Sequence, residues 1–142
     1  MGKTLERVYQ KVLEFYIQKK LKVGAGFDAA NQLPLEEQLE LIHEESAELS
    51  FEGRHFHSSD AGLEDLTRVV KEICDILYTC MGFFVVLGID PSDVFDMVHE
   101  SNMNKEGYID KRGKFVKGDS YVPPHKDIHT YLERRIGNGQ TG

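Results

Sequence analysis

Hydrophobic residues recur every three to four positions along most of the first hundred residues of the chain. This spacing places them on one face of an α-helix, whereas a strand would alternate them every two positions. The periodic segments predict four main helices, over about 4–22, 35–51, 63–87 and 90–103. Glycine and proline residues lie between these segments, where helices end and begin. The pattern therefore predicts an all-α fold that resembles a four-helix bundle.

The pattern changes after Lys105. Residues 106–118 are compatible with a β-hairpin around 111–113 or with an irregular loop, and the alternation of side chains does not decide between them. A last short helix is expected over 128–136, and 137–142 is expected to be a frayed tail. With 142 residues, we expect a single domain over 1–136 with an irregular C-terminal extension.

The end of the third helix is apolar on nearly every side, from Cys80 to Ile89. A helix that is apolar all round is buried all round, and in a small domain this suggests a subunit interface. We therefore expect a homo-oligomer, a dimer or a tetramer, in which Phe84 is buried between subunits.

Composition excludes several partners. The 17 Lys and Arg residues are outnumbered by 24 Asp and Glu residues, for a net charge of −7, and the absence of a long basic run argues against nucleic-acid binding. The longest apolar run is too short to span a membrane, and the first residues lack the apolar region of a secretory signal. Cys74 and Cys80 are too far apart on one helix to form a disulfide. We expect a protein of the reducing cytoplasm.

Five carboxylates in two short clusters are the main chemical feature of the chain. Glu44, Glu45 and Glu48 lie on the second predicted helix, and Glu72 and Asp75 follow on the third after 23 intervening residues. Residues three apart share a helix face, so the pairs Glu45/Glu48 and Glu72/Asp75 each project in one direction. Two such helices packed antiparallel would direct four oxygen ligands at one hard divalent cation, Mg²⁺ or Mn²⁺.

A simpler interpretation is that these acids are ordinary solvated helix surface, because Glu is a good helix former. Surface acids usually alternate with Lys or Arg, however, and between Glu36 and Glu52 the only basic side chain is His43. A di-iron centre is disfavoured, because Glu40 and His43 form a single Glu-x-x-His motif and such centres need two. Aromatic residues near the clusters are either core or base-stacking groups: Phe51, Phe56 and Tyr78.

The two clusters resemble a known family signature. Glu-Glu-x-x-Glu at 44–48 followed by Glu-x-x-Asp at 72–75 is similar to the motif of the MazG-like all-α nucleoside triphosphate pyrophosphohydrolases. Relatives of this group are the dimeric dUTPases, the dCTP pyrophosphatases and phosphoribosyl-ATP pyrophosphohydrolase. Asn102-Met103-Asn104-Lys105 is similar to the Asn-x-x-Lys element that contacts phosphates in several members. The additional Lys that members often carry just before this Asn is missing, because 98–101 reads Val-His-Glu-Ser.

The resemblance implies Mg²⁺-dependent hydrolysis of a nucleoside triphosphate, a dNTP or a non-canonical NTP, to the monophosphate and pyrophosphate. Glu45, Glu48, Glu72 and Asp75 are the predicted metal ligands, and Glu44 either orients or deprotonates the attacking water or lies on the surface. Asn102 and Lys105 are the predicted phosphate contacts. The alternative is a non-catalytic helical oligomer with a structural or regulatory metal or nucleotide site.

Overall fold

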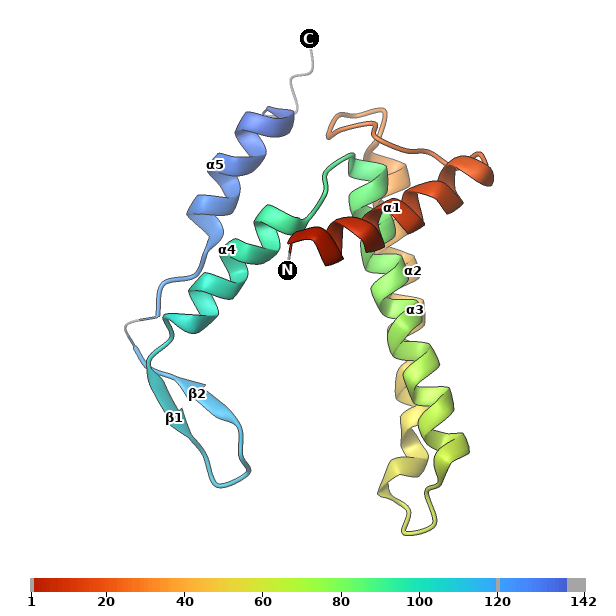
Figure 1. The fold of residues 1–142 in the computed structure, drawn as a ribbon, viewed down its shortest axis with the longest axis vertical. Helices are drawn as coiled ribbons and strands as arrows, with labels where there is room; N and C mark the ends of the chain where they lie inside the picture. Colours follow the sequence, from red (N-terminus) through yellow and green to blue (C-terminus); the bar gives the residue numbers. More distant parts are fainter. Residues whose placement is uncertain (1, 120, 138–142) are drawn as a thin grey trace.

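The computed structural model describes residues 2–119 and 121–137, which form five α-helices, one 3₁₀ turn and a two-stranded hairpin (Figure 1). The elements in chain order are α1 Gly2–Gln18, α2 Gln32–Glu52, η1 Gly53–His57, α3 Leu63–Leu87, α4 Ser92–Met103, β1 Gly107–Ile109, β2 Phe115–Lys117 and α5 His125–Ile136. The predicted all-α class is confirmed. The predicted tail lies outside the described residues except for Gly137.

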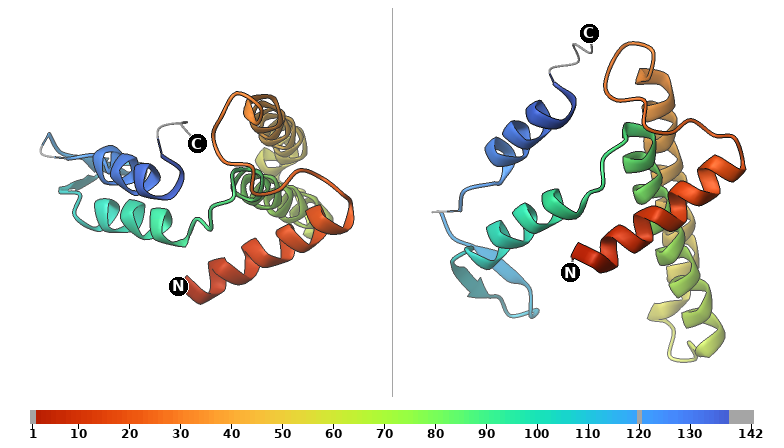
Figure 2. Two further views of the ribbon diagram at one scale, coloured as in Figure 1. Left: turned by 90° about the horizontal axis from the view of Figure 1, so that it is seen from above. Right: turned by 45° about the horizontal axis from the view of Figure 1, so that its top comes forward.

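The helices α2 and α3 form a long antiparallel pair, and α1 crosses over α3 (Figures 1 and 2). The pair is joined at one end by η1 and the loop that follows it. Helix α1 ends at Gln18, earlier than the periodicity predicts, because Lys20 adopts a left-handed φ of 59° and the Leu21 N–H returns to the Tyr16 carbonyl at 2.8 Å. Within the described part of the chain, no helix is long and apolar enough to cross a membrane.

The core lies where α1 crosses the C-terminal half of α3. Val85 and Val86 of α3 are fully buried, and Val12 and Tyr16 of α1 and Leu35 of α2 pack in the same cluster. The apolar stretch Cys80–Ile89 is thus covered largely from within the chain. Packing within one chain is enough to bury this stretch, and its role in a subunit interface stays a prediction.

The C-terminal end of α3 is closed by the loop that precedes α2. The last carbonyls of a helix lack intrahelical partners and must be satisfied by other groups. Backbone N–H groups of residues 24–26 donate to the carbonyls of Val85, Val86 and Leu87 at 2.9–3.1 Å. The amide of the fully buried Asn31 donates to both the Gly26 and the Val86 carbonyl. These bonds explain why the glycine-rich loop lies against the core.

The segment after α3 forms an arm that extends away from the α2–α3 pair. Gly88 ends α3 with a left-handed φ of 89°, and α4 then packs against α1 and α5 but, in the described residues, against neither α2 nor α3. The hairpin that the sequence left undecided is present, with Tyr108 paired with Val116. Both views in Figure 2 show the arm, made of α4, the hairpin and α5, to one side of the core.

Candidate metal centre

Three of the five carboxylates converge between α2 and α3. One carboxylate oxygen from each of Glu45, Glu72 and Asp75 lies within 4.8 Å of the other two. Glu45 comes from α2, and the i,i+3 pair Glu72/Asp75 comes from the facing side of α3. The helix periodicity that aims the pair inward is therefore the feature that builds the cluster.

The cluster contains buried oxygens without partners. Glu72 is only 8% exposed, and the Oε2 atoms of Glu72 and of Glu45 are buried with no hydrogen-bond partner. The pKa of the Glu45 carboxyl is raised, first by burial and then by the nearby charges of Glu48, Asp75 and Glu72. Buried carboxylates without partners are unfavourable unless a cation balances them.

The donor set fits a hard divalent cation. Mg²⁺ binds carboxylate oxygens at about 2.1 Å, so two ligands on opposite sides of the ion lie about 4.2 Å apart. The oxygens of Glu45, Glu72 and Asp75 all lie within 4.8 Å of one another, which is near this spacing. The cluster contains no nitrogen or sulfur ligand, which favours Mg²⁺ or Mn²⁺ over zinc.

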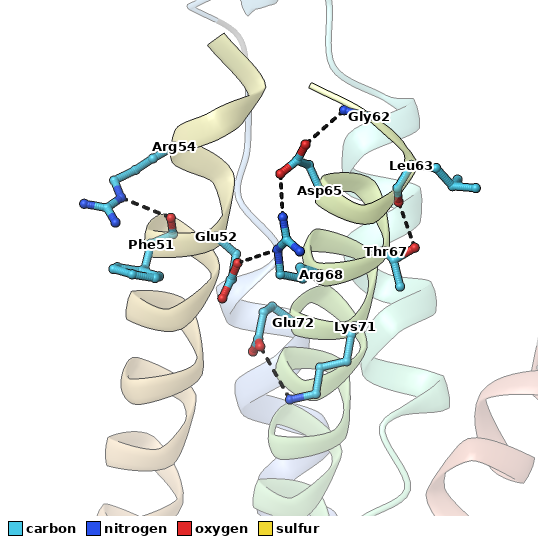
Figure 3. Close-up of polar contacts among 10 residues, drawn as sticks. All are labelled: Phe51, Glu52, Arg54, Gly62, Leu63, Asp65, Thr67, Arg68, Lys71 and Glu72. Atoms are coloured by element: carbon cyan, nitrogen blue, oxygen red, sulfur yellow. Dashed lines mark hydrogen bonds and ion pairs between the residues drawn. The ribbon is translucent and has the colours of Figure 1, made fainter. Parts of the chain in front are cut away.

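Sequence reasoning missed Lys71, the one ammonium group that contacts the cluster in the described structure. Its Nζ lies 2.6 Å from Asp75 and 3.4 Å from Glu72, and the contact with Glu72 is visible in Figure 3. The hydrogen bond to Asp75, followed by the charges of Asp75 and Glu72, raises the pKa of Lys71. The signal in the sequence was its i,i+4 spacing from Asp75.

The other two predicted acids lie at the edge of the cluster. Glu48 is exposed and outside the group of three, but its charge is close enough to raise the pKa of Glu45. Glu44 is exposed and, in the described structure, has no hydrogen-bond or ion-pair partner. The geometry thus separates three inner carboxylates from two outer ones.

Ionic contacts fix the two helices relative to each other on the loop side of the cluster. Arg68 of α3 contacts Glu52 of α2 at 3.2 Å and Asp65 at 2.6 Å (Figure 3). Asp65 also accepts the Gly62 N–H at 2.9 Å, and this bond, with Arg68, lowers the pKa of Asp65. The first turn of α3 is therefore capped and tied to α2.

The predicted phosphate contacts lie away from the carboxylates of their own chain. Asn102 is exposed at the end of α4, and Lys105 follows it with its Nζ 4.7 Å from the centre of the Tyr121 ring. Because α4 packs on neither α2 nor α3, a single chain does not bring Asn102 and Lys105 to the cluster.

The aromatic candidates also differ in their surroundings. Phe51 and Phe56 are exposed, and the Arg54 guanidinium lies 4.0 Å from the centre of the Phe51 ring. Tyr78 packs edge-on against Phe15, with ring centres 5.7 Å apart. All three rings are partly accessible, and Tyr78, which is 41% exposed, also packs against α1.

A carboxylate cluster between facing helices of an all-α chain could hold a divalent cation beside an anionic substrate. The family model for phosphoribosyl-ATP pyrophosphohydrolase matches residues 25–102, which are 78 of the 142 residues. The chain belongs to this family, within the MazG-like all-α superfamily, and is a pyrophosphohydrolase that acts on phosphoric anhydride bonds of a nucleotide-like substrate. A search of curated proteins finds no significant match to an individual protein.

Proposed function

We propose that the protein hydrolyses a nucleoside triphosphate to the monophosphate and pyrophosphate in a Mg²⁺-dependent reaction. The observation that carries the proposal is the convergence of Glu45, Glu72 and Asp75 with two buried, unpartnered carboxylate oxygens. A polyanionic substrate approaches such a site only if a cation lies between the two sets of oxygens. In this reaction water adds to phosphorus and the bond between the α- and β-phosphates breaks.

The residues have distinct roles in the proposal. Glu45, Glu72 and Asp75 hold the ion, and Glu48 completes the set of four. Bound Mg²⁺ neutralises phosphate oxygens and lowers the pKa of water. Glu44, next to this set on α2, either orients the attacking water and accepts its proton or remains a surface residue.

The carboxylates would bind the metal and the phosphates of any nucleoside triphosphate, so they do not select a base or a sugar. We propose a dNTP or a non-canonical NTP. The family's name adds phosphoribosyl-ATP, which carries the same triphosphate chain, as a compound to be tested. The base and the sugar would be recognised by groups outside the cluster, such as the exposed Phe51 and Phe56 rings.

We further propose that the protein acts as a homodimer or homotetramer. Leu66, Val70, Ile73 and Leu77 form an i,i+3/i,i+4 stripe along α3, and each is at least 44% exposed. Such a continuous apolar stripe is typical of a helix that packs against another. If Asn102 and Lys105 contact phosphates at a carboxylate cluster, they must come from a second copy. Both cysteines are free thiols, as a cytoplasmic setting requires.

A nucleotide panel with matched variants tests the function. Pyrophosphate release is measured with Mg²⁺ and with EDTA for wild type, Glu72→Gln and Asp75→Asn. We expect both variants to lose at least about 100-fold in kcat/KM while keeping their helical circular dichroism, because each swap removes a ligand charge at nearly constant shape.

The control variant is Glu64→Gln, which removes the same charge from an exposed position on α3. It should turn over as wild type does. If wild type releases no pyrophosphate from any compound while Mg²⁺ still raises its Tm, the cluster is a structural or regulatory metal site and the proposed reaction is wrong.

A further inference from the structure

The hairpin and the residues just before it carry a concentrated positive charge in an otherwise acidic chain. Five basic residues and only two acidic ones fall within residues 105–117, whereas the whole chain has a net charge of −7. Four of the cations line one cavity of about 380 Å³ between the end of α4 and the hairpin: Lys105, Arg112, Lys114 and Lys117. This volume lies in the range of small-molecule sites. The hairpin also lies beyond the family match, which ends at residue 102.

Most of these cations have no carboxylate partner. Asp110 is the only acid that lines the cavity, and its Oδ1 accepts the backbone N–H groups of Arg112 and Lys114 at 2.9 and 3.0 Å. Its one ion pair, with Arg112, is long, at 3.9 Å. In the described structure, Lys105, Lys114 and Lys117 form no ion pair. Asp110 therefore shapes the turn and leaves the cavity positively charged.

Two of the ammonium groups contact the same aromatic ring. The Nζ atoms of Lys105 and Lys117 each lie 4.7 Å from the centre of the Tyr121 ring, so they are separated by at most twice that distance. The Tyr121 hydroxyl accepts a hydrogen bond from Ser101 of α4 at 3.4 Å, and the same hydroxyl of Ser101 also contacts the Val122 carbonyl. Tyr121 therefore links both lysines to the end of α4.

The backbone holds the hairpin in this shape. The Gly118 N–H donates to the Glu106 carbonyl at 2.6 Å, and Gly113 takes a left-handed φ of 82° in the turn. A Cβ at Gly107 would overlap the Val116 carbonyl. The strands are therefore in close contact, and the lysines project from a defined element rather than from a loose loop.

We propose that this hairpin cavity is a binding site for the phosphate chain of a nucleotide, with Arg112, Lys114 and Lys117 as its ligands together with Lys105. Ammonium and guanidinium groups without carboxylate partners are the usual receptors for phosphate oxygens. The assignment of the bound phosphate chain to a nucleotide rests on the proposed function. The binding of an oligophosphate does not, because it needs neither the carboxylates nor a metal.

Calorimetric titration with tripolyphosphate in EDTA tests the site directly. Wild type is compared with Lys114→Gln/Lys117→Gln and with the control Lys11→Gln/Lys19→Gln, which removes the same charge from exposed positions on or next to α1. We expect the hairpin variant to bind at least about tenfold more weakly and the control to bind as wild type. Circular dichroism verifies that all variants are folded.

Three outcomes of this titration would overturn the proposal. They are no binding by wild type, equal binding by the hairpin variant, and an equal loss in both variants, which would indicate net charge rather than a site. Glu72→Gln should bind tripolyphosphate in EDTA as wild type does. If the protein binds tripolyphosphate but hydrolyses no nucleotide, the proposed function is wrong and the oligophosphate site remains.

Competition identifies the source of the phosphate chain. A non-hydrolysable nucleoside triphosphate should displace tripolyphosphate at a concentration where orthophosphate does not. If orthophosphate displaces it equally well, the cavity is a free-phosphate site and the assignment to a nucleotide is wrong. With hydrolysable substrate and Mg²⁺, the hairpin variant should have a raised KM and a less strongly lowered kcat. The reason is that the two lysines it lacks bind the phosphate chain of the substrate.

Discussion

At the residue scale, the charge of the carboxylate cluster is partly balanced by a single lysine. The Lys71 ammonium contacts Asp75 and Glu72, two of the carboxylates that would hold a metal ion. Its side chain is 64% exposed, so it moves away at little cost, since exposed ion pairs contribute little. Lys71 and a divalent cation would therefore compete for the same oxygens.

The substitution Lys71→Gln should increase the response to metal. Without the ammonium group the carboxylates repel one another more strongly, so the metal-free protein should have a slightly lower Tm and Mg²⁺ should raise Tm by more than in wild type. Thermal melts over a Mg²⁺ titration measure both effects, with Lys19→Gln as the control. A Mg²⁺ shift equal to or smaller than that of wild type would show that Lys71 does not compete with the ion.

The spacing of residues along the helices predicts part of the carboxylate cluster but not all of it. The i,i+3 spacing of Glu72 and Asp75 was enough to place both on one face, and the structure brings Glu45 to them. Glu48 shares that spacing with Glu45, yet it lies outside the group of three. Whether a side chain at the edge of a helix face reaches the facing helix depends on how the two helices pack. The ion pairs of Lys71 depend on rotamers of a long side chain, which the sequence does not fix.

At the element scale, the crossing of α1 over α3 depends on a glycine inside a helix. Gly82 is buried next to the hydrogen bond from the Tyr16 hydroxyl to the Gln38 amide oxygen, which measures 2.7 Å. A Cβ at position 82 would lie 2.7 Å from that amide oxygen and would overlap the Tyr16 hydroxyl. This glycine lets three helices approach closely at the core.

The substitution Gly82→Ala should therefore destabilise the protein, although Gly→Ala inside a helix normally stabilises it by up to about 1 kcal/mol. Overpacking of a filled site costs about 1–3 kcal/mol, and here it also breaks a buried hydrogen bond. Urea unfolding measures the change. Gly53→Ala is the control, because a Cβ there meets nothing within 4 Å, and it should be neutral or slightly stabilising. An increase in stability for Gly82→Ala would show that the crossing has room to adjust.

The elements themselves could be predicted where the periodicity was long. Helix α3 has the predicted bounds, 63–87, because many turns of regular apolar spacing define it and Gly88 ends it. The hairpin remained open because its strands have only three residues each, which is too short for alternation to be recognised. The direction of α4 depends on the backbone angles at Gly88, and a glycine allows many.

At the scale of the whole molecule, two surfaces of the described residues can be compared for their chemistry. One is the apolar stripe of α3, from Leu66 to Leu77, and the other is the basic hairpin cavity of the arm. The carboxylates carry the charge opposite to that of the hairpin. Complementary surfaces that do not meet within one chain are the usual basis of symmetric assembly, in which each copy supplies what the other lacks.

The apolar stretch that the sequence analysis assigned to an interface packs largely against its own chain. Phe84 and its neighbours pack on the core of their own chain, so Phe84→Glu should unfold the protein rather than only dissociate it. The stripe of α3 is the better test. Leu77 is 60% exposed in the single chain, so Leu77→Glu should preserve the fold and remove an interface contact.

We expect wild type to sediment as a dimer or tetramer, and Leu77→Glu to sediment as a smaller species with unchanged circular dichroism. Val122→Glu is the control, because Val122 is even more exposed but lies outside the helices. A monodisperse wild-type monomer, or an unchanged mass for Leu77→Glu, would contradict the assembly. The dissociated variant should keep its Mg²⁺-induced rise in Tm, because Glu45, Glu72 and Asp75 come from one chain. It should lose turnover, because in the proposed assembly Asn102 and Lys105 contact the substrate phosphates at the cluster of a second copy.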